Sequence, residues 1–404
     1  MNALLFSGAR EIVTCAPPQA ECVRAREAVL VRDGRIAAVG AASALLAQEP
    51  SAQPIDCDGG TITPGFVDSH THAVFGGWRA EEYALRSRGM SYMEIARRGG
   101  GINASVRDVR ARSEDELVEL TRPRLETMLR LGTTTVEVKS GYGLDTGSEL
   151  KQLRAVRRLQ GEAVVDVIPT FLGAHEFPLE YRDQPEAYVD LIVNEMIPAV
   201  AEERLAVFCD VFMEPGVFTA AQSRRVLEAG LEHGLLPKLH ADELENSGAA
   251  ELAVQLGAAS ADHLGAISEA GIDAIAGSAT VATLLPATLL FLGKRQYAPA
   301  RRLIDAGATV ALATDFNPGS SPTQSMALVL TLACSLMGMN PLEAIIAATA
   351  GGARALRMTD GTGTLQPGAP ADLVVWDVAS HMELPYRFGT PPLRGVWKRG
   401  VRVV

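Results

Sequence analysis

Residues 66–72, FVDSHTH, begin as a short apolar run and end with two histidines that are separated by one residue. Seven similar apolar runs follow, and amphipathic charged segments lie between most of them. The eight runs are residues 66–72, 134–140, 166–175, 207–214, 236–243, 259–264, 279–286 and 309–316. Short buried strands that alternate with amphipathic helices are typical of repeated βα units. Eight such units predict an α/β fold, the TIM barrel.

Two other interpretations of this central region are excluded. A doubly wound sheet that binds a dinucleotide has the fingerprint G-x-G-x-x-G after an early strand, and the chain contains no such fingerprint. The uncharged stretch between Asp273 and Lys294 has the length of a membrane span, but Gly277, Pro286 and several threonines interrupt it. We therefore interpret this stretch as a buried strand with its flanking residues.

Both ends of the chain predict β structure. Asp33-Gly34 lies between two apolar runs, a pattern typical of a β-hairpin, and a second hairpin is predicted to turn near Arg399-Gly400. Because isolated hairpins are only marginally stable, we expect the two ends to pair into one small β-sandwich. The sequence thus predicts a discontinuous domain of residues 1–62 and 358–404, and a catalytic barrel of residues 63–357.

Charge and cysteine content narrow the class of protein. The 404 residues include 48 acidic and 37 basic side chains, which gives a formal charge of -11. This balance excludes the broad basic surface of a nucleic-acid-binding protein and argues against adhesion to anionic membranes. The five cysteines are widely spaced without a C-x-x-C pair, and the N-terminus lacks the form of a signal peptide. We expect a cytoplasmic protein with reduced thiols.

Polar residues with catalytic potential follow the apolar runs. They are His70, His72, Lys139, His175, Glu214, His240, Glu243, His263 and Asp315. In a TIM barrel the carboxyl ends of all strands lie on one face, where the active site is built. Residues that are far apart in the sequence are therefore predicted to meet at one site.

His70 and His72 are predicted to share a metal ion, because side chains two residues apart on a strand point to the same side. His240 and Asp315 complete a set of three imidazoles and one carboxylate that suits zinc or iron. On its own the histidine pair would also fit two hydrogen-bonded buried side chains. An ion in such a set can activate water near neutral pH, so hydrolysis or deamination is expected.

Three residues are predicted to act on the substrate beside the ion. Asp315 can accept the proton of the attacking water and pass it to the leaving nitrogen. His263 can orient the water or stabilise the oxyanion, although it could instead only orient a ligand. Glu243 can bind a ring N–H, and the alternative is a solvated loop carboxylate. Lys139 could bridge two metals if carboxylated, but we interpret it as a structural cation because one ligand set is already complete.

The chain resembles the amidohydrolase superfamily from residue 63 onward. The segments that carry the resemblance are HAVFGGWR (72–79), ARRGGGI (96–102), EVKSGYG (137–143), FLGAH (171–175), KLHADE (238–243), ADHL (261–264) and ATDFNPGSSPT (313–323). The H-x-H pair with a late Asp marks the superfamily. The other segments are similar to a branch that opens a cyclic amide ring in histidine degradation. The resemblance implies a metal-bearing barrel flanked by a small β-sandwich from both chain ends.

The resemblance also implies site residues. One zinc or iron ion per subunit would be held by His70, His72, His240 and Asp315. Arg79, Tyr142, His175, Glu243 and Ser320 would contact the anionic substrate 4-imidazolone-5-propanoate, Asn317 and Gly319 would hold the product, and Tyr92 would border the pocket. A guanidinium such as that of Arg79 binds a carboxylate with two parallel hydrogen bonds, as an ammonium cannot.

These observations lead to a hypothesis with two rivals. The hypothesis is metal-dependent hydrolysis of 4-imidazolone-5-propanoate to N-formimidoyl-L-glutamate by a homodimer. The first rival is an aminohydrolase acting on a purine or pyrimidine, which would release ammonia, whereas this ring opening releases none. The second rival is a barrel that has lost catalysis and serves as a scaffold, which would hold no metal ion.

Overall fold

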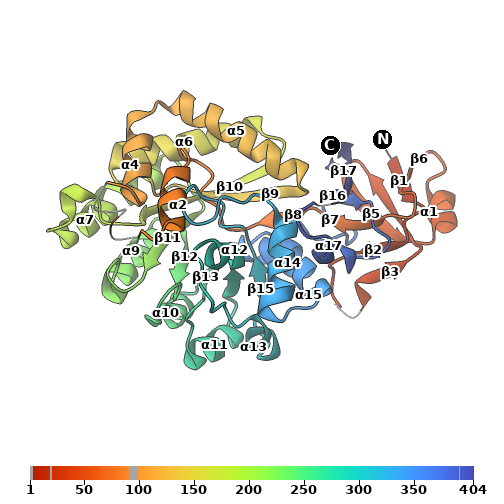
Figure 1. Ribbon diagram of the computed structural model, residues 1–404. Helices are drawn as coiled ribbons and strands as arrows, with labels where there is room; N and C mark the ends of the chain where they lie inside the picture. The colour runs from red at the N-terminus through yellow and green to blue at the C-terminus, as the bar shows by residue number, and fades with distance from the viewer. Residues whose placement is uncertain (1–2, 19–20, 91–93, 95–98, 391) are drawn as a thin grey trace.

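Eight parallel strands form a nearly closed barrel in the computed structural model, which describes residues 3–18, 21–90, 94, 99–390 and 392–404 (Figure 1). The order of the strands in the sheet is their order in the chain. The strands are β8 (Phe66–Asp68), β9 (Thr133–Lys139), β10 (Asp166–Ala174), β11 (Phe208–Met213), β12 (Leu236–Ala241), β13 (Ser260–His263), β14 (Val281–Leu284) and β15 (Val310–Leu312). Each predicted run overlaps one strand, so the TIM barrel is confirmed.

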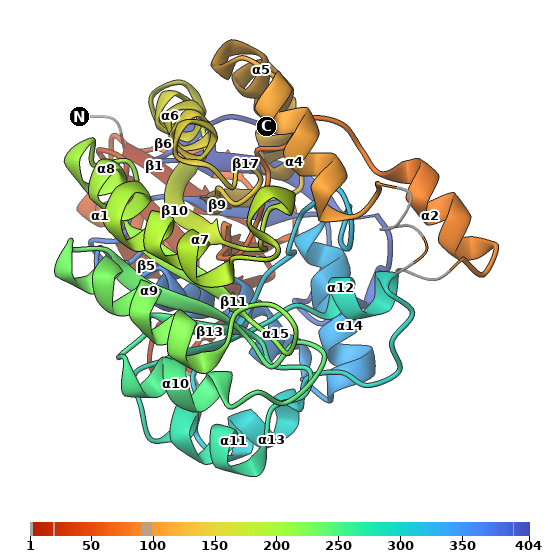
Figure 2. The same ribbon diagram turned by 90° about the vertical axis from the view of Figure 1, so that its left-hand side faces the viewer.

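Helices surround the strands (Figure 2). Those along the barrel are α2 (Ala80–Ser87), α4 (Ile102–Ala111), α5 (Glu114–Arg130), α6 (Thr146–Glu162), α7 (Pro185–Leu191), α8 (Ile197–Glu202), α9 (Ala220–Glu232), α10 (Ala249–Gln255), α11 (Glu269–Ala276), α12 (Pro286–Phe291), α13 (Ala300–Asp305), α14 (Met326–Met337), α15 (Pro341–Ile346) and α16 (Gly352–Ala355). Local sequence sets some of their starts. Ser113 and Glu116 exchange capping hydrogen bonds at the start of α5, and Thr219 and Gln222 do the same for α9.

The chain ends form two further sheets. One has the order β5-β4-β1-β6 and the other β18-β17-β16-β7-β2-β3. Their strands are β1 (Ala3–Ser7), β2 (Glu11–Val13), β3 (Val23–Ala25), β4 (Ala28–Arg32), β5 (Arg35–Gly40), β6 (Gln53–Asp56), β7 (Thr61–Pro64), β16 (Leu373–Trp376), β17 (Leu393–Lys398) and β18 (Val401–Arg402). Arg32 pairs with Arg35 and Lys398 with Val401, which confirms both predicted hairpins. Helices α1 (Ala42–Gln48) and α17 (Glu383–Tyr386) complete the terminal segments.

The two terminal sheets share an apolar core. Phe6 of one sheet and Trp397 of the other pack edge to face, with ring centroids 5.1 Å apart, and β16 pairs with β7 from the opposite end of the chain. The predicted sandwich from both termini is therefore confirmed as an architecture. We keep the division into residues 1–62 with 358–404 and residues 63–357 as a proposal, and note that its first border falls within β7.

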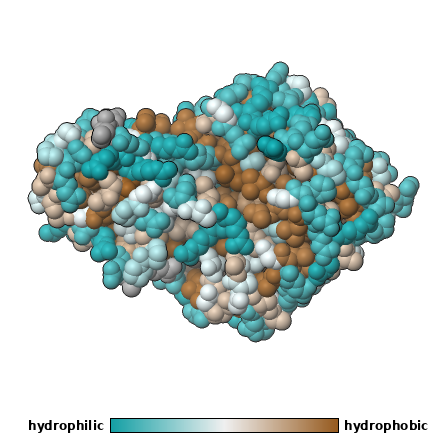
Figure 3. Space-filling model, turned by 180° about the vertical axis from the view of Figure 1, so that it is seen from behind, coloured by the Kyte–Doolittle hydropathy of each residue, from teal (hydrophilic) through white to brown (hydrophobic). Residues whose placement is uncertain are grey.

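The uncharged stretch before Lys294 contains the end of α11, then β14 and α12. All residues of β14 are buried, as expected for a barrel strand. In the described part of the chain, every helix is too short or too polar to span a bilayer. Seen from behind, the surface is mostly hydrophilic, with hydrophobic atoms gathered in a band near the middle of that face (Figure 3). Folded proteins retain such apolar area, so the band alone does not assign a partner.

Candidate active site

The seam that closes the barrel carries three of the predicted metal ligands. Asp315 N donates a hydrogen bond to His70 O at 3.0 Å, and His72 N donates to Phe316 O at 2.9 Å. A parallel bridge joins Thr71 to Phe316 at the same place. The backbone at the junction of the first and last strands therefore holds His70, His72 and Asp315 side by side.

His70, His72 and Asp315 present ligand atoms that lie within 4.8 Å of one another, and His240 faces His72. His72 Nε2 lies 3.4 Å from His240 Nε2 and 3.4 Å from Asp315 Oδ1. His70 Nε2 lies 3.6 Å from the same Asp315 oxygen, and it is buried without a hydrogen-bond partner in the described part of the chain. Ligand atoms about 2.0–2.1 Å from a tetrahedral zinc ion are separated by roughly 3.4 Å. The spacings of His70, His72 and Asp315 are therefore those of ligands to one metal ion, and the four-residue set that includes His240 stays a prediction.

Two buried carboxylates orient two of these imidazoles. Asp262 Oδ2 lies 2.6 Å from His70 Nδ1. Asp210 Oδ2 lies 3.0 Å from His240 Nδ1, off the line of an ideal hydrogen bond. A carboxylate that accepts the Nδ1 proton leaves the lone pair on Nε2, the nitrogen that faces the other ligands. The His70 ring is thus held in the tautomer that binds a cation, and the charge of Asp210 favours the same tautomer at His240.

The protonation states of the ligands also suit a metal ion. Burial and the nearby Lys139 ammonium lower the pKa of His70 well below its usual value. Burial alone would raise the pKa of Asp315, but contacts with His72, His263 and Thr288 lower it to about 2. Neutral imidazole and ionised carboxylate are the forms that bind metals.

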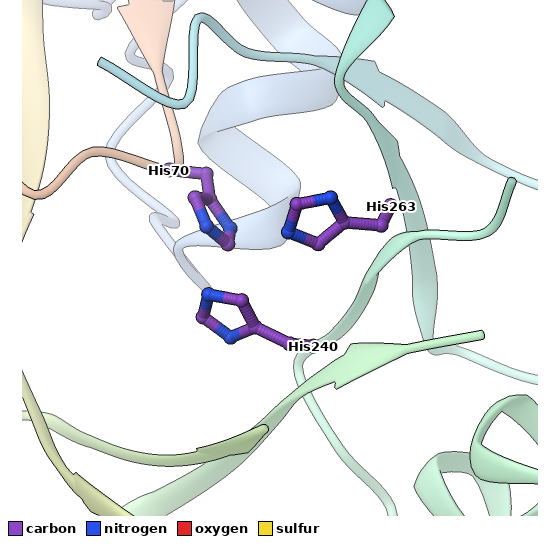
Figure 4. A group of neighbouring side chains, drawn as sticks. All are labelled: His70, His240 and His263. Atoms are coloured by element: carbon purple, nitrogen blue, oxygen red, sulfur yellow. The ribbon is translucent and has the colours of Figure 1, made fainter. Parts of the chain in front are cut away.

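His263 reaches the site through a rare backbone conformation. Its φ is +81°, and its ring centroid lies 5.3 Å from that of His70 and 5.1 Å from that of His240. Figure 4 shows the three rings facing a common space. Neither ring nitrogen of His263 has a hydrogen-bond partner in the described part of the chain, and Nδ1 lies 3.7 Å from Glu243 Oε2. His263 is therefore placed to act on a ligand beside the ion.

A cavity of about 640 Å³ opens over these side chains, a size suited to a small molecule. Its lining includes the predicted contact residues Arg79, Tyr142, His175, Glu243, Asn317, Gly319 and Ser320, together with His72, His240, His263 and Asp315. Tyr92, the remaining predicted residue, lies outside the described residues. The same cavity is therefore lined by predicted metal ligands and by the Arg79 guanidinium.

Arg79 lies in the cavity wall with one edge of its guanidinium occupied. Its Nε donates to Glu82 Oε2 at 3.1 Å, and Glu82 Oε1 accepts a hydrogen bond from Gly101 N at 2.9 Å. A Cβ added to Gly319 would lie only 2.4 Å from Arg79 Cζ, so the guanidinium occupies space that a side chain at Gly319 would fill. The two terminal nitrogens of Arg79 form the edge that can receive a carboxylate.

The loop of residues 317–320 satisfies its own donors. Asn317 Oδ1 accepts hydrogen bonds from Gly319 N at 2.8 Å and from Ser320 N at 2.7 Å. Asn317 Nδ2 donates to Asp315 O at 2.7 Å. These donors would have to exchange partners before they could bind a product, so their role in holding it stays a prediction.

Helix α6 fixes the loop that carries Tyr142. The fully buried Glu149 accepts hydrogen bonds from Gly141 N at 3.1 Å and Gly143 N at 2.7 Å. Gln152 Oε1 accepts one from Tyr142 N at 3.1 Å. A loop held through several backbone donors keeps its side chains in a fixed place.

His175 packs between this loop and the metal ligands. Its ring is nearly parallel to that of His72, at 17° and 5.0 Å between centroids, and its Nδ1 lies 2.9 Å from Gly141 O. Since a carbonyl oxygen can only accept, Nδ1 carries the proton and Nε2 can accept a hydrogen bond. Burial lowers the pKa of His175 well below its usual value, which keeps the ring neutral.

Comparison with known proteins agrees with this geometry. The profile of the Amidohydrolase family matches residues 61–404. An imidazolonepropionase from Symbiobacterium thermophilum is 48% identical over 99% of this chain and 97% of its own length, and one from Myxococcus xanthus is 50% identical over 92% and 88%. The chain belongs to the amidohydrolase family, among the imidazolonepropionases. The predicted resemblance is confirmed.

Solved structures of two deaminases share the whole fold. A zinc-bound adenosine deaminase from Xanthomonas campestris has a TM-score of 0.74 at 21% identity and covers 99% of this chain and 92% of its own. Guanine deaminase from E. coli has a TM-score of 0.75 at 16% identity, with 100% and 99% covered. At such identities the likeness establishes the fold alone. Membership of the amidohydrolase family makes this protein a hydrolase of carbon–nitrogen bonds in a generally metal-dependent family.

Two side chains that the sequence pattern does not assign to the site, Thr288 and Glu214, support it in this amidohydrolase. Thr288 Oγ1 donates to Asp315 Oδ2 at 2.6 Å. Glu214 accepts hydrogen bonds from Glu243 N at 3.1 Å and Glu245 N at 2.7 Å, which fixes the loop of Glu243. Glu214 was noted only as a polar strand end, and nothing in the local pattern of Thr288 marks it. Both partners come from different βα units, so a single sequence carries no signal for them.

Proposed function

We propose that this chain hydrolyses the cyclic amide C–N bond of 4-imidazolone-5-propanoate to N-formimidoyl-L-glutamate in histidine degradation. The observation that carries the proposal is one cavity whose lining brings His72, His240, His263 and Asp315 close to the Arg79 guanidinium, with the buried His70 beside them. The ligand set suits hydrolysis, and the guanidinium suits the propionate of the substrate. The names of the near full-length relatives support this choice of substrate.

One zinc or iron ion per subunit, held by His70, His72, His240 and Asp315, is part of the proposal. When bound, such an ion activates water and polarises the carbonyl group that it faces. Both metals accept imidazole and carboxylate ligands, so metal analysis of the purified protein distinguishes them.

Proton movement falls to Asp315 and His263. Asp315 takes a proton from the attacking water and delivers it to the ring nitrogen as the C–N bond breaks, while Thr288 holds its second oxygen. His263 donates a hydrogen bond to the carbonyl oxygen as negative charge develops there. One water is consumed, the ring opens into a carboxylate and an amidine nitrogen, and no ammonia leaves.

The other cavity residues bind and orient the substrate. Glu243 accepts the ring N–H of the imidazolone, and burial raises the pKa of this carboxyl, opposed mainly by His263. Arg79 and Tyr142 bind the propionate, and His175 and Ser320 also contact the substrate. We assign Asn317 and Gly319 to the product and Tyr92 to the border of the pocket, as the family resemblance implies.

A coupled assay tests the proposed reaction. Urocanase converts urocanate to imidazolone propionate, and the disappearance of its absorbance is followed with and without the purified protein. We expect decay much faster than the spontaneous rate, with no ammonia released. Unchanged decay would overturn the substrate assignment, and ammonia release from purines or pyrimidines would favour the aminohydrolase.

Metal content, assembly and location are tested separately. Less than about half an equivalent of zinc or iron after purification without chelators, together with no activity, would favour a scaffold. We also propose a homodimer, to be tested by sedimentation, because the family resemblance supports one. The cysteine pattern supports a cytoplasmic location, which fractionation of the source cells would test.

A further inference from the structure

The barrel interior behind the metal ligands contains a group of fully buried charged side chains. They are Glu137, Lys139, Asp210, Lys238 and Asp262. Lys139 Nζ donates to Glu137 Oε1 and to Asp210 Oδ2, each at 2.8 Å. Buried charges are costly unless they are paired, so each member of this group depends on its partners.

Lys139 links the two carboxylates that face the metal-site histidines. Asp210 Oδ2, which accepts from Lys139, is the atom that lies 3.0 Å from His240 Nδ1. Asp262 Oδ2 lies 3.9 Å from Lys139 Nζ and 2.6 Å from His70 Nδ1. One ammonium on β9 thus lies between carboxylates on β11 and β13, which face His240 on β12 and His70 just after β8.

Lys238 has a different set of contacts. Its Nζ donates to Ser69 O and to Glu137 Oε1, each at 2.9 Å, and lies 3.6 Å from Asp262 Oδ2. Lys139 is therefore the lysine that bonds directly to a carboxylate beside a ligand imidazole. The buried group holds one more carboxylate than ammonium groups, an excess of negative charge that favours a cation at the neighbouring site.

We propose that Lys139 is a positioning residue of the metal site, which holds Asp210 and Asp262 so that His240 and His70 keep their Nε2 lone pairs directed at the ion. The ammonium holds Asp210 by a hydrogen bond and Asp262 by charge alone, a role that it shares with Lys238, and the carboxylates favour the tautomer and tilt of the rings. This inference rests on the proposed metal site and is independent of the identity of the substrate.

Metal retention of a Lys139→Met variant tests the inference. Methionine has a similar length without the charge. We expect the loaded variant to lose its metal to a chelator at least about tenfold faster than the unmodified protein. We also expect the visible absorption of the Co²⁺-loaded variant to shift, because the rings tilt in the ligand field. Neither measurement uses substrate, so a wrong substrate assignment does not affect them.

Lys398→Met is the matched control. Lys398 is also a buried lysine that donates to two aspartates, Asp166 and Asp372, but in the terminal part of the fold and away from the histidines. We expect this variant to melt earlier and to retain its metal like the unmodified protein. Equal metal loss from both variants would mean that the effect is general destabilisation, and would overturn the proposal.

A second variant, Asp210→Asn, tests the same positioning role by the same measurements if Lys139→Met does not fold. Asparagine keeps the shape of the side chain, but it weakens the hydrogen bond from Lys139 and removes the negative charge beside His240. We expect faster metal loss than from the unmodified protein and a shifted Co²⁺ spectrum. Normal retention and an unchanged spectrum in Asp210→Asn, or in a folded Lys139→Met, would overturn the positioning role.

Discussion

The barrel and the terminal sandwich differ in their interiors, although the sandwich also contains one buried ion pair, Lys398 with Asp372. The sandwich core is apolar and includes Leu4, Phe6, Ile12, Val31, Ile62, Leu373, Val375 and Trp397. The barrel interior contains, besides its apolar residues, the buried charges of Glu137, Lys139, Asp210, Lys238 and Asp262. An apolar core stabilises a fold more effectively than buried ion pairs, because the cost of removing the charges from water offsets most of the attraction between them. The buried charges of the barrel therefore position the metal-site side chains at a cost in stability, whereas the apolar core of the sandwich stabilises the fold.

The largest expected effect is that of Asp315→Asn in the barrel. The variant keeps the shape of the side chain but cannot move the proton, so we expect kcat/KM to fall about a thousandfold. The coupled assay measures the loss, and circular dichroism checks the fold. Asp377→Asn, an exposed aspartate paired with Arg394 in the terminal part, is the control and should keep full activity. Near-normal turnover of Asp315→Asn would contradict its assignment.

Arg79→Met should have the next largest effect. Removal of the guanidinium leaves the propionate without its partner, and we expect kcat/KM to fall about a hundredfold, mainly through KM. Arg79→Lys should recover only part of the loss, since an ammonium cannot bind with two parallel bonds. Arg86→Met is the control, because Arg86 lines the same cavity but stacks over Phe291 at 5.0 Å. Equal losses in both variants would mean that only the charge of the cavity matters.

Gly319→Ala should have a smaller effect of the same kind. The added methyl group would displace the guanidinium of Arg79, which lies where the Cβ would be. We expect KM to rise about tenfold with little change in kcat, as misplacement of a binding group predicts. Steady-state kinetics measure this, with Gly161→Ala on α6, where the Cβ meets open space, as the control. An unchanged KM would show that Arg79 does not need its observed position.

Trp397→Ala should have the smallest effect on activity. Loss of this ring from the sandwich core should cost about 3–5 kcal/mol of unfolding free energy. The kcat/KM of the folded fraction should stay unchanged if the sandwich serves stability alone. Chemical denaturation and kinetics measure the two quantities, with Val401→Ala at the exposed C-terminal strand as the control. A large fall in the kcat/KM of the folded protein would contradict the conclusion that the sandwich contributes to stability alone.

The barrel and the nearness of His70, His72 and Asp315 could be predicted because their signals are local. Each apolar run is short, most of the runs carry polar residues at or near their ends, and the alternation of strand side chains directs His70 and His72 to the same side. The same alternation predicts that Glu137 points to the same side as Lys139, and Lys238 to the same side as His240. These pairs lie on the inward faces of β9 and β12.

The supporting contacts could not be predicted from the sequence. Asp262 and His263 are neighbours on one strand and would point to opposite faces in a regular β conformation. The positive φ at His263 breaks this rule and brings both side chains to the site. Likewise, Thr288 meets Asp315 only through the geometry of two different βα units. Such contacts depend on the closed barrel rather than on any local pattern.

The site can form only after the last barrel strand has been synthesised, because that strand closes the barrel. His70 and His72 are made early by the ribosome, yet their backbone neighbours at Asp315 and Phe316 emerge last among the barrel strands. Until then the first ligands have neither their carboxylate partner nor a closed ring of strands. Nascent or prematurely ended chains that stop before residue 309 are therefore unable to assemble the complete ligand set, so the activity belongs only to chains whose barrel has been finished.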